Sequence, residues 1–77
     1  MNVLLIEDNE SIVSGLKYSL EQEKYKVFSC TNVEDTIKFL EENKQVDIAI
    51  IDISLPHGTG FDLYHNYIKV KNIPSIL

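Results

Sequence analysis

Four short apolar segments alternate along this chain with stretches in which apolar residues recur every three or four positions. The apolar segments cover residues 2–6, 26–31, 46–53 and 73–77, and we expect each to form a strand. The intervening stretches have the period of helices that pack on one side. Their apolar positions are Ile12, Val13, Leu16 and Leu20, then Val33, Ile37 and Leu40, then Phe61, Leu63, Tyr64 and Ile68. Strands that alternate with helices predict an α/β fold with a parallel sheet.

The apolar segments differ in how continuously apolar they are, and this difference predicts their order in the sheet. Segments 2–6 and 46–53 are nearly continuous, as strands buried on both faces are. Segment 26–31 alternates mildly between apolar and polar residues, which is typical of an edge strand. We therefore expect a doubly wound parallel sheet with the flavodoxin-like order 2-1-3-4-5. Such sheets bind ligands at the carboxyl ends of the first and third strands.

Polar residues before two of the predicted helices have the pattern of N-caps. Asp8 or Asn9 can cap the first helix. Thr31 followed by Glu34 has the spacing of a capping box, which predicts the start of the second helix. The third helix follows a loop rich in Gly and Pro, and we expect it to reach about Val70.

The composition is that of one small domain. The chain has 77 residues, and 44% of them are hydrophobic, which is near the norm for folded globular proteins. Cys30 has no second cysteine with which to form an internal disulfide. Glu7 and Asp8 interrupt the first apolar run, so it does not resemble a signal peptide, and no run approaches the roughly 20 residues that cross a bilayer. We expect a single domain over residues 1–77, located in a reducing cytoplasm without a membrane segment.

The net charge of −5 argues against nucleic-acid binding by this segment. Twelve acidic residues stand against seven basic ones, and all seven are lysines. Arginine is the side chain that most often reads guanine edges in DNA. Any contact with DNA would therefore come from sequence outside this segment.

Three acidic residues follow the first and third predicted strands. Glu7 and Asp8 end the first strand, and Asp52 lies at the end of the third. In the predicted order these strands are neighbours, so their carboxylates converge on one crevice. Like charges at such distances repel one another unless a cation neutralises them. Mg²⁺ takes one or two carboxylates and leaves positions for phosphate oxygens, so we expect a Mg²⁺ site there.

Three motifs of the chain resemble the receiver domain of two-component response regulators. They are V-L-L-I-E-D-N near the start, D-I-A-I-I-D-I-S-L-P-H-G-T-G-F-D-L in the middle and I-P-S-I-L at the end. The resemblance covers the whole chain, and the spacing of Asp52, Pro56 and Gly60, each four residues from the last, is specific to that family. The middle motif is similar to receivers that are joined to winged-helix DNA-binding domains.

The resemblance implies a role for each residue of the acidic crevice. Asp52 would accept a phosphoryl group from the phosphohistidine of a sensor histidine kinase. Asp8 and Asp52 would bind Mg²⁺ directly, Glu7 would act through a bound water, and the backbone carbonyl of Ser54 would complete the protein ligands. Pro56 and Gly60 would shape the loop beside the acidic crevice. The domain would be a signalling phosphoacceptor that assists its own phosphorylation and dephosphorylation, and not an enzyme acting on other substrates.

The resemblance also implies parts that this sequence does not contain. The family domain has five strands, so we expect the chain to be an incomplete receiver domain that stops within strand four. The family's phosphate-sensing Ser or Thr and its strand-five Lys would both follow Leu77. An uncovered sheet face and an unprotected edge strand predict that the chain associates with itself or with another chain. The full-length protein would control transcription through a further domain.

Other functions are compatible with this fold class. A flavin-binding module would have a loop rich in Gly, Ser and Thr after the first strand, where this chain has Glu, Asp and Asn. An aspartyl phosphatase would place its acids two apart at that strand. A receiver-like interaction module that takes no phosphate stays open, because only residues after Leu77 bear on it. We expect His57 and His65 to be solvated and Cys30 to be a small packed hydrophobe.

Overall fold

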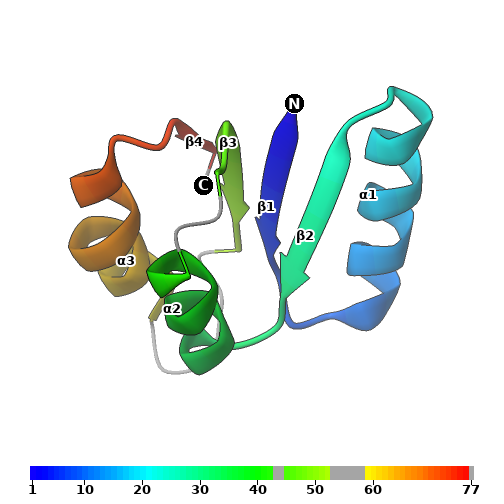
Figure 1. The fold of residues 1–77 in the computed structure, drawn as a ribbon. Coiled ribbons are helices and arrows are strands. Elements are labelled where there is room, and N and C mark those ends of the chain that lie inside the picture. Colours follow the sequence, from blue (N-terminus) through cyan, green and yellow to red (C-terminus); the bar gives the residue numbers. More distant parts are fainter. Residues whose placement is uncertain (43–44, 53–58, 77) are drawn as a thin grey trace.

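The computed structural model describes residues 1–42, 45–52 and 59–76, which form one parallel sheet with helices on both faces (Figure 1). The elements alternate between strand and helix as the sequence predicts. Their bounds are β1 Asn2–Ile6, α1 Glu10–Gln22, β2 Lys26–Cys30, α2 Val33–Glu41, β3 Ile48–Ile51, α3 Thr59–Leu63 and β4 Ser75–Ile76.

The strand order is β2-β1-β3-β4, with every neighbouring pair parallel. This confirms the predicted doubly wound order, in which β2 lies at an edge and β1 and β3 lie side by side. Ile6 at the end of β1 is in register with Cys30 of β2 and with Ile51 of β3. The carboxyl ends of the three strands therefore meet at the same edge of the sheet.

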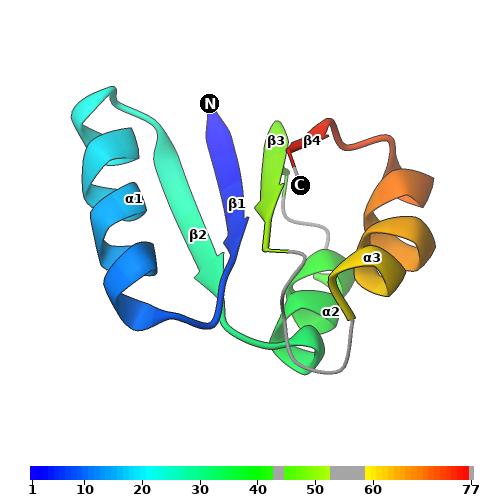
Figure 2. The same ribbon diagram turned by 180° about the vertical axis from the view of Figure 1, so that it is seen from behind.

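The side chains of β1 alternate between the two faces of the sheet, and each face has its own core. Leu4 and Ile6 pack on the side of α2 and α3, and Val3 and Leu5 pack on the side of α1. Figures 1 and 2 show α1 on one side and α2 with α3 on the other. All four of these β1 side chains are at most 1% exposed, so β1 is the buried centre that its continuous apolar run predicts.

Asn9 and Asn32 cap the first two helices. The Asn9 side-chain oxygen accepts from the backbone N–H groups of Ser11 and Ile12, which selects Asn9 over Asp8. The prediction that Thr31 caps α2 was wrong by one residue. Asn32 accepts from the Asp35 N–H at 2.8 Å and donates its amide to the Asp35 carboxylate at 3.1 Å. The Asn32 amide supplies both the acceptor and the donor of these two bonds. The Thr31 hydroxyl lies one residue too early in the chain to make them.

The third predicted helix is not uniform. After α3 the chain widens into a π-helical turn over Tyr64–Ile68 and then tightens into a 3₁₀ turn over Lys69–Lys71, so the predicted end near Val70 agrees within a residue. Leu63 and Ile68 are both buried although they are five positions apart. In a straight α-helix such positions diverge, and the i to i+5 spacing of the π turn brings both toward the core.

Three strands are shorter than their apolar runs, β2 by the one residue Thr31 at its end. β3 covers Ile48–Ile51 within the predicted 46–53, and β4 covers Ser75–Ile76 within 73–77. Before β3, Asp47 is tied to the start of β1, because its carboxylate accepts from the Asn2 N–H at 2.6 Å. Positions 53 and 77 lie outside the described residues. No helix in the described part of the chain is long and apolar enough to span a membrane.

Candidate metal centre

The register of the central strands brings the predicted acids to one edge of the sheet. Glu7 follows β1 directly, and its N–H donates to the Cys30 carbonyl of β2 at 3.1 Å. Asp52 follows β3, and its N–H donates to the Ile6 carbonyl at 2.9 Å. The sheet hydrogen bonding thus continues one residue beyond β1 and β3. Both acidic residues are held by backbone contacts that do not depend on their side chains.

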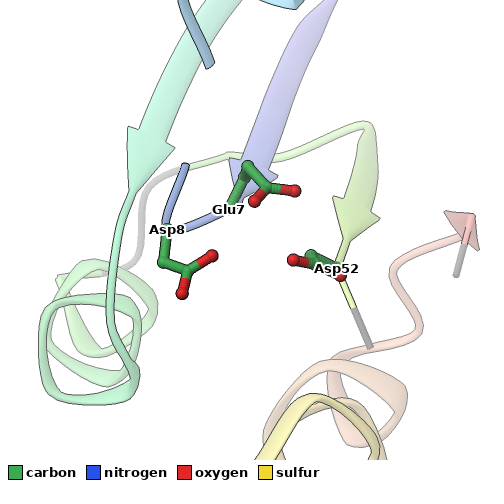
Figure 3. A group of neighbouring side chains, drawn as sticks. All are labelled: Glu7, Asp8 and Asp52. Atoms are coloured by element: carbon green, nitrogen blue, oxygen red, sulfur yellow. The ribbon is translucent and has the colours of Figure 1, made fainter. Parts of the chain in front are cut away.

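Glu7, Asp8 and Asp52 form a single cluster of carboxylates (Figure 3). One oxygen from each of the three lies within 4.8 Å of the others. Glu7 is buried, Asp52 is half-buried and Asp8 is exposed, so the cluster opens to solvent on one side. Figure 3 shows the Asp52 carboxylate directed across the edge of the sheet toward the two acids that follow β1.

The surroundings of Glu7 favour its protonated form in the absence of a cation. Burial is the largest influence and raises the pKa of Glu7 above its ordinary value, because the charged form is poorly solvated there. The backbone N–H of Asn9 donates to one Glu7 carboxylate oxygen at 3.0 Å, and this hydrogen bond lowers the pKa in part. The charge of Asp52 and hydrogen bonding to Asp52 and Asp8 raise it again.

The donor set of the cluster fits a small hard divalent cation. It consists of carboxylate oxygens only, which Mg²⁺ and Ca²⁺ prefer and which Zn²⁺ takes less often than nitrogen or sulfur. A bound dication would also remove the like-charge repulsion that raises the pKa of Glu7. On the exposed side of the cluster, the bound cation would keep coordination positions for water or phosphate oxygens, as Mg²⁺ does at sites with few protein ligands.

The remaining residues singled out in the sequence are only partly described. Ser54, Pro56 and His57 lie outside the described residues. Gly60 is buried within α3, and His65 is exposed on the π-helical turn. Cys30 is 7% exposed and packs in the core on the side of α2, which confirms that it is a packed hydrophobe.

Asn9 is a contact of the cluster that the sequence interpretation missed. The sequence predicts Asn9 only as a possible helix cap and does not predict its backbone hydrogen bond to Glu7. A residue that can cap a helix, two positions after an acidic residue that ends a strand, is a sequence signal for such a hydrogen bond. Asn9 has the extended cap conformation, with φ −86° and ψ 110°, and its N–H faces back toward Glu7.

The family of the chain follows from a match over nearly its whole length. Residues 3–77 match the model of the response regulator receiver domain. The chain belongs to this family. As a receiver domain it has the expected parallel sheet, with the acidic cluster at the carboxyl ends of β1 and β3.

Curated relatives of this receiver domain include transcriptional regulators. It is 32% identical to the transcriptional regulatory protein AfsQ1 of Streptomyces coelicolor over 99% of this chain and 33% of the relative. It is 34% identical to the heme response regulator HssR of Staphylococcus epidermidis over 100% of this chain and 34% of the relative. The chain thus spans about a third of the length of these relatives.

Solved receiver domains share the fold. The non-phosphorylated HemR receiver domain of Leptospira biflexa is 35% identical with a TM-score of 0.80, over 96% of this chain and 60% of that one. The response regulator TrrA of Thermotoga maritima, solved in complex with Mg²⁺ and BeF, is 28% identical with a TM-score of 0.84. That match covers 99% of this chain and 66% of the other.

Proposed function

We propose that this receiver domain accepts a phosphoryl group on Asp52 from the phosphohistidine of a sensor histidine kinase in the cytoplasm. The observation that carries the proposal is the convergence of Asp52 with Glu7 and Asp8 at the switch point of the sheet. The carboxylates of Glu7 and Asp8 are suited to hold a divalent cation next to Asp52, the group that would react. The complex of TrrA with Mg²⁺ and BeF is consistent with such chemistry in a related domain.

In the proposed reaction, a carboxylate oxygen of Asp52 forms a bond to phosphorus as the phosphorus–nitrogen bond of the phosphohistidine breaks. The electron pair of that bond stays on the imidazole nitrogen, which can take up a proton. Asp8, Asp52 and the Ser54 carbonyl would hold Mg²⁺ directly, and Glu7 would act through a water. When bound, Mg²⁺ supplies positive charge that neutralises the phosphoryl oxygens. The chain's own part is to keep Asp52 oriented and open to the incoming group.

The acceptor is used once in each cycle, so the domain is a signalling phosphoacceptor and not an enzyme with a separate substrate. The product adds negative charge beside Glu7 and Asp8, which favours a rearrangement of the site. We propose that the full-length protein uses this change to regulate transcription. The relatives named as transcriptional regulators support this output. The net charge of −5 supports the proposal that any DNA contact is made outside this segment.

The test is phosphorylation by a small phosphodonor in the presence of Mg²⁺, followed by intact-mass and peptide mass spectrometry. We expect one added phosphoryl group on Asp52, lost on removal of Mg²⁺ and absent in Asp52→Ala. Asp47→Ala is the matched control, because Asp47 lies at the opposite end of β3. The competing function is a receiver-like interaction module that takes no phosphate. Absence of modification would favour that alternative, and modification that survives Asp52→Ala would refute Asp52 as the acceptor.

We also propose that the chain self-associates through the β4 edge with a second copy of itself. Among the described strands β4 pairs with β3 alone, and Ile76 is 55% exposed on it. Ile12 and Leu16 leave further apolar surface exposed on α1. Exposed strand edges recruit other strands. Sedimentation velocity over a wide concentration range should show dimers, weakened in Ile76→Lys, and a monomer at every concentration would refute this proposal.

A further inference from the structure

Asn9 joins the first helix to the acidic cluster through two sets of hydrogen bonds. Its side-chain oxygen accepts from the N–H groups of Ser11 at 3.0 Å and Ile12 at 3.2 Å. Its own backbone N–H donates to a carboxylate oxygen of Glu7 at 3.0 Å. The residue is exposed, so its value to the fold does not come from burial. The same residue therefore begins α1 and holds Glu7.

These two sets of bonds depend on one another. The side-chain bonds hold Asn9 in the extended conformation of an N-cap, with φ −86° and ψ 110°. With α1 in place, that conformation fixes the peptide between Asp8 and Asn9, and with it the Asn9 N–H, from the helix side. Without the side-chain acceptor, the Asn9 carbonyl still accepts from the Val13 N–H at 3.0 Å, but the first turn of α1 holds this peptide less firmly, and the N–H is less well fixed toward Glu7.

The hydrogen bond orients the Glu7 carboxylate within the cluster. Glu7 is only 8% exposed and lies beside two other acids, so an untethered carboxylate there would turn away from the repulsion. Because the Asn9 N–H engages one oxygen, it restricts the orientations of the Glu7 carboxylate. In the proposed site Glu7 holds a water bound to the cation, and groups in this outer shell commonly control metal affinity although they do not touch the ion.

We propose that Asn9 is a positioning residue of the cation site, whose side-chain cap of α1 holds the backbone N–H that orients Glu7. Asn9 itself does not bind the cation. This inference rests on the proposed Mg²⁺ site. It adds that Mg²⁺ binding and the order of the first turn of α1 are linked, so that each strengthens the other.

The test compares two helix caps of the same chemistry. Asn9→Gly removes the side-chain acceptor, and Gly is nearly as favourable as Asn at an N-cap, so the variant should fold. Asn32→Gly removes the equivalent cap of α2, whose oxygen accepts from Asp35 at 2.8 Å and has no contact with the cluster among the described residues. Asn9→Ser restores an oxygen that can cap the helix. The full chain is titrated with Mg²⁺ alone, and NMR follows the Asn9 amide proton and the Glu7 side-chain carboxyl carbon.

We expect the Mg²⁺ dissociation constant to rise about tenfold in Asn9→Gly, as for other groups that orient metal ligands. It should stay unchanged in Asn32→Gly and return close to the original value in Asn9→Ser. In Asn9→Gly without Mg²⁺, the chemical shift of the backbone amide proton at position 9 should move toward that of an amide that has no carboxylate acceptor.

Three results would overturn the inference, and they can be told apart. If the unaltered chain binds Mg²⁺ and Asn9→Gly binds it equally well, Asn9 does not position the site, and the proposed function stands. If the unaltered chain shows no response to Mg²⁺ at Glu7, both proposals fail. Equal weakening by Asn9→Gly and Asn32→Gly would mean that loss of helix order alone explains the effect, which also overturns the inference.

Discussion

The backbone N–H of Asp52 donates to the carbonyl of Ile6 at 2.9 Å. Ile6 immediately precedes Glu7, so this one bond places the acid that follows β3 beside the acids that follow β1. It belongs to the ladder between two parallel strands, in which Ile51 is in register with Ile6. The position of Asp52 is therefore set by the pairing of the sheet and not by the acidic side chains, which repel one another.

Loss of one carboxylate should weaken Mg²⁺ binding. Asp8→Asn keeps the shape of the side chain and removes one charged ligand, so we expect the Mg²⁺ dissociation constant to rise at least about tenfold. Asp47→Asn makes the same change at the opposite end of β3 and should leave the constant unaltered. Isothermal titration calorimetry measures both. Equal affinities in the two variants would contradict a site at this cluster.

The stability of the chain without Mg²⁺ should depend on pH through Glu7. The folded state raises the pKa of Glu7 above 4.5, chiefly by burial, so it holds this proton more tightly than the unfolded state does. The contribution of Glu7 to the free energy of unfolding is then greatest below pH 4.5 and is lost as the pH rises through the raised pKa.

Glu7→Gln removes this dependence while keeping the acceptor for the Asn9 N–H. Without Mg²⁺ we expect Glu7→Gln to be more stable than the unaltered chain at about pH 7, and to lose that advantage at about pH 4. Urea denaturation at the two pH values measures the difference. Glu41→Gln, at an exposed position of α2, is the control. A difference between the variants that does not change with pH would contradict the prediction.

Leu4 should contribute far more to stability than Leu16. Leu4 is 0% exposed at the centre of β1, whereas Leu16 is 37% exposed on α1. We expect Leu4→Ala to lower the free energy of unfolding by about 2–5 kcal/mol, since it leaves a cavity in the core. The matched change Leu16→Ala should cost less than about 1 kcal/mol, because this site is solvated and Ala is a strong helix former. Urea denaturation of both variants tests the ranking, and equal losses would refute it.

Cys30 should be protected from thiol reagents until the chain opens. Burial raises the pKa of its thiol, and the contact with the Thr36 hydroxyl lowers it only in part. Reaction needs both an exposed sulfur and a thiolate. We expect modification to be at least about a hundredfold slower in buffer than in urea, because only opened molecules react. Since Cys30 is the single cysteine, Cys30→Ser gives the background rate. Similar rates in the two conditions would contradict its burial.

The order of elements, the central place of β1 and β3, and the identity of the acids at their ends could all be predicted from the sequence. These features depend on local runs of apolar residues and on the polar residues that end them, which are visible in one dimension. The strand order followed because an edge strand differs from a buried one in its pattern. The family resemblance rested on the same acids and agrees with the match over residues 3–77.

How the acids are held became visible in the folded structure. The start of α2 at Asn32 and the widened turn after α3 depend on which backbone groups find partners and which side chains reach the core. The hydrogen bond from Asn9 to Glu7 joins two nearby residues and depends on the backbone conformation between them. The raised pKa of Glu7 depends on burial and on the approach of Asp52 from a neighbouring strand. Burial and such approaches arise when segments far apart in the chain are brought together, and residue types alone do not specify them.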